Sequence, residues 1–161
     1  MKFFTNKKSR NTLKKFVSVN CEIRAKISNR VGFQTQNIQF AEDDNSDQIV
    51  FLGRSYENGF QDSKKGMYIQ CTSELESKTY SPKDPDFPFS EFYYFESADN
   101  GEFTTFYNYP AESGTIDVEV IEKSSETLRY LIKYNVKGRD SRTEELHIVG
   151  EAELNVFKRS A

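Results

Sequence analysis

The sequence contains no tryptophan, one histidine and two cysteines among its 161 residues. A single histidine excludes a histidine metal cluster, and two cysteines are too few for a disulfide framework. The lack of tryptophan weakens a carbohydrate-binding platform. The chain also has no G-x-S-x-G motif, no glycine-rich phosphate loop and no C-x-x-C pair. These absences exclude most functions that can be recognised from a short sequence motif.

Long apolar stretches are missing as well. No stretch reaches the roughly 18 apolar residues that a membrane-spanning helix requires, so no transmembrane segment is expected. The hydrophobic content is 36% and the mean hydropathy is −0.73, which is low for a globular domain. Thin two-layer β folds tolerate such a composition, because about half of each strand faces water.

Charge is unevenly distributed. Residues 1–16 contain six basic and no acidic side chains, which leaves 16 basic and 25 acidic side chains for the rest of the chain. An acidic body argues against binding of DNA or RNA. We interpret residues 1–15 as a basic, flexible leader that could touch an anionic surface, and residues 16–158 as a single β domain.

A strict alternation is the clearest feature that is present. From Val17 to Ile27 apolar or small residues alternate with polar ones, and the pattern returns from Leu146 to Val156. Side chains of a strand point to opposite faces in turn, so both segments are predicted strands with one buried face. Similar segments elsewhere give about nine strands. We therefore predict an all-β fold, an antiparallel β-sandwich, with a closed lipocalin-like β-barrel as the alternative.

A hairpin is predicted where Asn100-Gly101 separates two aromatic runs. A two-residue turn at these positions would place Phe95 opposite Phe106, Tyr94 opposite Tyr107, and Phe92 opposite Tyr109. Between positions 87 and 109 the chain has 10 Phe or Tyr residues, on both parities of the strands. Either both faces of the hairpin are covered, or an exposed aromatic patch marks a ligand or partner surface. The candidate surface residues are Phe92, Tyr93, Tyr94, Phe95, Phe106, Tyr107 and Tyr109.

The other candidate sites are weaker. His147 falls on the polar parity of the last strand, where a general base has neither cleft nor partner. Residues 43–47 begin like a calcium loop but lack its later Gly and Glu, so a hairpin turn is expected. Cys21 and Cys71 occupy apolar positions of strands and are predicted to be buried free thiols. We predict no catalytic residue, no metal site and no cofactor.

A family resemblance starts at the segment CEIRAKISNRVGFQTQNIQF and continues at QIVFLGRS and TFYNYPAESGTIDVEVIEK. Over residues 21–157 the chain resembles small bacterial all-β lipoprotein-type domains of unknown function. Two departures are Phe33, where that family often has Trp, and the lack of an export leader before Cys21. The resemblance implies a β fold and an envelope location, with no assigned activity.

These observations favour a non-catalytic binding or interaction module, with association with the cell envelope as one option. The alternatives are a lipocalin-like carrier of a small apolar ligand and an acidic, antitoxin-type inhibitor of a basic protein. As written, the chain is expected in the cytoplasm, or anchored at the envelope if an export leader is cryptic or missing. The expected partner is an unknown protein or a small apolar ligand, and not a nucleic acid.

Overall fold

The structure is a computed structural model that describes residues 2–5, 9–10, 15–57, 60–99 and 104–160. Within these ranges the regular structure is all strand, and no helix is present that could span a membrane. The strands are β1 (Lys2–Thr5), β2 (Ser9–Arg10), β3 (Lys15–Ile27), β4 (Phe33–Thr35), β5 (Ile38–Glu42), β6 (Gln48–Glu57), β7 (Phe60–Thr72), β8 (Lys78–Tyr80), β9 (Phe89–Asp99), β10 (Thr104–Lys123), β11 (Thr127–Arg139) and β12 (Glu145–Ser160).

The strands form one antiparallel sheet in the order β1-β5-β6-β7-β9-β10-β11-β12-β3-β2, with β4 beside β3 and β8 beside β10. The last strand, β12, pairs along its length with the early strand β3, so the sheet curls back toward its beginning. The two ends of the sheet are β1 beside β5 and β2 beside β3, and these ends form no strand pairing with each other within the described residues. An ion pair of 3.1 Å between Lys158 on β12 and Glu42 on β5 reaches across that side. The all-β prediction is confirmed, and the nearly closed barrel is the architecture that the sequence left as the alternative to a sandwich.

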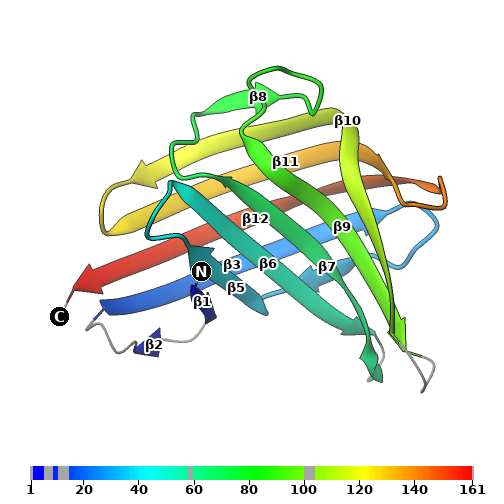
Figure 1. The fold of residues 1–161 in the computed structure, drawn as a ribbon, viewed down its shortest axis with the longest axis horizontal. Coiled ribbons are helices and arrows are strands. Elements are labelled where there is room, and N and C mark those ends of the chain that lie inside the picture. Colours follow the sequence, from blue (N-terminus) through cyan, green and yellow to red (C-terminus); the bar gives the residue numbers. More distant parts are fainter. Residues whose placement is uncertain (1, 6–8, 11–14, 58–59, 100–103, 161) are drawn as a thin grey trace.

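Strand β10 joins two layers of this barrel. Its first part pairs with β9 and its second part, from Ala111 onward, pairs with β11. A register shift between Ala111 and Ser113 and a positive φ of 105° at Gly114 mark the bend. A Cβ at Gly114 would lie 2.2 Å from the carbonyl oxygen of Asn135, so only glycine fits there. Figure 1 shows the result, in which β6, β7 and β9 cross in front of β11, β12 and β3.

The alternation of apolar and polar residues in the sequence matches the alternation of buried and outward-facing side chains in the strands. On β3 the apolar side chains from Val17 to Ile27 are buried, while Glu22, Arg24 and their polar neighbours face outward. On β12 the side chains from Leu146 to Val156 follow the same rule, with Gly150 at one inward position. The inward face is continuous with the buried side chains of β6, β7, β9 and β11, so one core fills the space between the two layers.

The predicted hairpin register is wrong by two residues. Tyr94 pairs with Tyr109 and Phe95 pairs with Asn108, instead of the three aromatic pairs that a two-residue turn would give. The turn at Asn100-Gly101 itself lies outside the described residues. A shift of two residues keeps each side chain on its predicted face, because strand faces alternate with a period of two. Rings that the predicted register placed on one face of the hairpin therefore still share a face, although their partners differ.

Two parts of the predicted leader join the sheet. Residues of β1 pair with β5, and residues of β2 pair with the start of β3.

The acidic segment at 43–47 forms the turn between β5 and β6, as predicted, with Asp43 accepting hydrogen bonds from the Asn45 amide and the Ser46 hydroxyl. Both cysteines are buried and form no disulfide in the described part of the chain, which confirms the prediction of buried thiols.

Candidate functional site

The seven aromatic candidates do not share one surface. Three of them point into the core, where Tyr94 and Tyr109 have centroids 5.9 Å apart and Phe92 packs edge-on against Tyr134 at 5.5 Å. Phe95 is buried on the outer side. Tyr93 and Tyr107 are half-buried and Phe106 is exposed.

Tyr93 belongs to a small outer stack. Its ring lies parallel to that of Tyr68 on β7, with centroids 5.0 Å apart and planes 8° from parallel. Phe95 meets Tyr93 edge-on at 6.3 Å and covers Gly66, where a Cβ would lie 2.8 Å from the Phe95 ring. The aromatic segment therefore stabilises both sides of the β7–β9 layer, and most of its apolar area is unavailable to a ligand.

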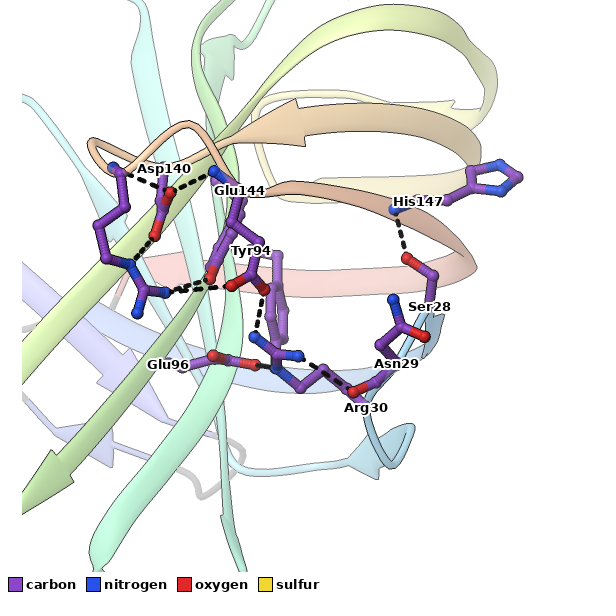
Figure 2. Close-up of polar contacts among 10 residues, drawn as sticks. Ser28, Asn29, Arg30, Tyr94, Glu96, Asp140, Glu144 and His147 are labelled. Carbon is purple, nitrogen blue, oxygen red and sulfur yellow. Dashed lines mark hydrogen bonds and ion pairs between the residues drawn. The ribbon is translucent and has the colours of Figure 1, made fainter.

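A charged cluster lies where the β3–β4 turn, the β11–β12 turn and strand β9 meet (Figure 2). Arg30, in the first of these turns, is central to it. Its Nε donates to Glu96 Oε1 at 2.6 Å, and a terminal nitrogen donates to Glu144 Oε1 at 2.5 Å. The Tyr94 hydroxyl donates to the same Glu96 oxygen at 2.8 Å. Burial alone would lower the pKa of Arg30, but its hydrogen bonds to Glu96 and Glu144 and their charges raise that pKa.

A second arginine completes the cluster. Arg142 Nε donates to Asp140 Oδ2 at 2.5 Å, and another nitrogen of its guanidinium donates to the Tyr109 hydroxyl at 3.1 Å. The guanidinium also lies 3.8 Å from the centroid of the Tyr107 ring, a cation–π contact. We call Arg30, Glu96, Asp140, Arg142 and Glu144 the Arg30 network.

Asp140 organises the β11–β12 turn. Its side chain is only 1% exposed, and it accepts hydrogen bonds from the backbone amides of Arg142 at 3.0 Å and Glu144 at 2.9 Å. Burial favours its neutral form, but the Arg142 side chain, the two amides and the arginine charge outweigh burial and lower the pKa of Asp140. Both arginines of the Arg30 network are thus held by carboxylates, and this arrangement stabilises the two turns relative to each other.

A different feature lies on the outer face of the other layer. A hollow of about 830 Å³ runs across β10, β11, β12, β3 and β4, and we call it the outer groove. Its lining residues are Arg24, Ala25, Lys26, Gly32, Phe33, Gln34, Thr115, Asp117, Lys133, Tyr134, Asn135, Val149, Gly150 and Glu151. None of these belongs to the aromatic candidate set.

Strand register explains why residues so distant in sequence line one groove. Two neighbouring cross-strand rows form its centre. One row runs Gln34–Arg24–Glu151–Lys133–Asp117, and the next runs Lys26–Val149–Asn135–Thr115. Side chains of directly opposed residues lie on the same face of a sheet, so both rows project outward together.

The floor of the outer groove is apolar. Val149 projects from β12 at the centre and is 37% exposed. Gly150 follows it, and a Cβ there would lie 2.0 Å from the carbonyl oxygen of Arg24. The missing side chain lets Tyr134, on β11, pass over β12 and donate its hydroxyl to that Arg24 oxygen at 2.7 Å. Gly150 thus allows the close packing of three strands beneath the groove.

Charges of the groove differ in how well they are paired. Arg24 is 3.5 Å from Glu22 and 3.4 Å from Glu151, and Asp117 accepts a hydrogen bond of 3.2 Å from Thr79. Lys26 and Lys133, by contrast, make no hydrogen bond or ion pair within the described part of the chain. The groove therefore combines an apolar floor with two available ammonium groups.

The other candidate residues named from the sequence hold structural positions in the fold. His147 is exposed on β12, as its parity predicted, and its Nε2 lies 2.5 Å from Asn135 Oδ1. The Cys21 thiol is buried in the middle of β3, and burial raises its pKa to about 12. Burial likewise raises the pKa of Cys71. Both thiols thus stay protonated at neutral pH, which makes them weak nucleophiles. No cluster of metal-ligating side chains occurs among the residues that the structure describes.

Comparison of the chain with models of known protein families, with curated proteins and with solved structures gives no match. Sequence reasoning missed the outer groove, because its lining residues come from five strands that are distant in the sequence.

Proposed function

We propose that the protein is a non-catalytic binding module and that the outer groove is its binding site. The observation that carries this proposal is a hollow of about 830 Å³ with an apolar centre. Small-molecule sites in proteins range from about 300 to 1,000 Å³ and combine apolar walls with a few polar groups. The outer groove has this size and this composition.

The interior of the barrel supports binding less well. The aromatic segment would line an internal ligand site, yet its inward rings pack against one another and against the opposite layer. Phe33 stacks on Tyr94 at 6.3 Å, and Phe92 reaches Tyr134 on β11. These contacts favour an external groove over a carrier that encloses its ligand.

The perturbed groups support binding rather than catalysis. Burial raises the pKa values of Cys21, Cys71, Tyr130 and Tyr134, so these groups are protonated and unreactive near neutral pH. A catalytic nucleophile or base needs a pKa matched to its task. The two arginines of the Arg30 network are already occupied by carboxylates.

Native mass spectrometry of the protein purified from its own host tests this proposal. We expect a small-molecule adduct on the wild-type protein that is lost in Val149→Glu, because a carboxylate on the groove floor would oppose an apolar ligand. Phe157→Glu is the matched control, since Phe157 is 44% exposed on the same strand but outside the outer groove. Absence of any adduct on the wild type, or an equal adduct on Val149→Glu, contradicts the proposal.

A further inference from the structure

We infer that the outer groove takes small molecules that combine a flat or elongated apolar body with one anionic group, which Lys26 and Lys133 bind. This inference rests on the proposed function and adds the chemical class of the ligand. Its starting point is the pairing of charges in the groove, where two ammonium groups remain without a partner among the described residues.

The two lysines flank the apolar floor diagonally. Lys26 on β3 lies opposite Val149, and Lys133 on β11 lies opposite Glu151, which is two residues further along β12. Strands about 4.8 Å apart and a rise of about 3.4 Å per residue place the two lysine backbones on the order of 12 Å apart. Two long, flexible side chains can therefore converge on one anionic group held between them.

Carboxylates that face these lysines are engaged elsewhere. Glu151 contacts Arg24 at 3.4 Å, and Asp117, directly opposite Lys133, accepts the Thr79 hydroxyl at 3.2 Å. Across the groove side chains the formal charge is three positive against two negative, in a body that carries 16 basic and 25 acidic residues beyond position 16. An anion is therefore favoured at this place although the molecule as a whole repels it.

The neighbouring row of the same face sets the orientation. Glu22, Glu153 and Glu119 occupy that row, with Leu131 between the last two. Like charges repel an anionic group from this side. The anionic group should therefore lie on the side of Lys26 and Asn135, while the apolar body covers Val149 and the backbone of Gly150.

Two dyes with the same ring system separate the contributions of charge and apolar surface. The anionic probe is 1-anilinonaphthalene-8-sulfonate, and the neutral probe is N-phenyl-1-naphthylamine, which lacks the sulfonate. Fluorescence titrations would compare the wild type with Lys26→Gln/Lys133→Gln, with Val149→Glu, and with Lys137→Gln as a control on β11 outside the groove. Thermal unfolding of each variant verifies that it is folded.

We expect the double lysine variant to weaken binding of the anionic dye about tenfold and to leave the neutral dye unchanged. Lys137→Gln should change neither, and Val149→Glu should weaken both. If the lysine variant binds both dyes like the wild type while Val149→Glu loses both, the assignment of an anionic ligand is wrong and the groove remains. If the wild type binds neither dye, or Val149→Glu binds both normally, the groove itself is not the site and the proposed function fails.

Discussion

The Arg30 network and the outer groove hold similar kinds of charged side chains but use them in opposite ways. In the Arg30 network, Arg30 and Arg142 each contact carboxylates at 2.5 Å, and two tyrosine hydroxyls take part. In the outer groove, Lys26 and Lys133 surround an exposed valine and contact no carboxylate among the described residues. Charges that satisfy one another hold turns together, whereas charges left beside an apolar hollow are available to a ligand.

The largest effect is expected beneath the outer groove. Gly150→Ala places a Cβ about 2.0 Å from a backbone oxygen, which cannot move without separating β12 from β3. We expect a loss of at least about 3 kcal/mol in the free energy of unfolding, measured by urea denaturation. Gly53→Ala is the control, because its Cβ would meet side-chain carbons at 3.0 to 3.4 Å. An equal loss in both variants would contradict this role of Gly150.

Removal of Arg30 should have the next largest effect. Arg30→Ala leaves Glu96 and Glu144 without their shared cation, and we expect a loss of about 1–3 kcal/mol in the free energy of unfolding. Arg24→Ala, in the outer groove, is the matched comparison. Arg24 is 45% exposed and its ion pairs are longer, so the expected loss is at most about 1 kcal/mol. A larger loss for Arg24 than for Arg30 would reverse the comparison between the two regions.

Asp140 gives the Arg30 network a dependence on pH. Its pKa is lowered in the folded protein, so its contribution to stability is present above the unfolded value, about 3.9, and is lost as the pH falls through the folded value. We expect Asp140→Asn to be less stable than the wild type at pH 7. Thermal unfolding between pH 7 and pH 2.5 should show this difference shrinking below about pH 4. A difference that stays constant with pH would show that the carboxylate charge plays no part.

The smallest effect on stability is expected for the groove lysines. Lys26→Gln and Lys133→Gln each remove a charge that has no partner among the described residues, so the free energy of unfolding should change by less than about 0.5 kcal/mol. Urea denaturation in low salt measures this change. A clear loss of stability in either variant would mean that these lysines are part of the fold rather than of a binding site.

The barrel strands were predictable because their signal is local. The alternation from Val17 to Ile27 and from Leu146 to Val156 determines which side chains are buried, whatever the partner strand. The hairpin register was not predictable, because it depends on the length of the turn between β9 and β10. The choice between sandwich and barrel was also open, because it depends on whether β12 pairs with β3. That pairing joins segments from the two ends of the domain.

Neither charged region could be read from the sequence. Arg30 meets Glu96 at a separation of 66 residues and Glu144 at a separation of 114 residues. The outer groove is formed by rows that cross five strands, so its lining depends on the register of every pair between them. Local pattern says which face a lysine occupies, but not which carboxylates lie beside it in the folded sheet.

The most direct test of the account is where a bound probe contacts the protein. In a sample with labelled methyl groups and bound 1-anilinonaphthalene-8-sulfonate, nuclear Overhauser effects report protons close to the dye. We expect contacts between the dye and the methyl groups of Val149 on the outer side of β12. Contacts with the buried methyl groups of Ile132 or Leu154 instead would place the ligand inside the barrel and contradict it.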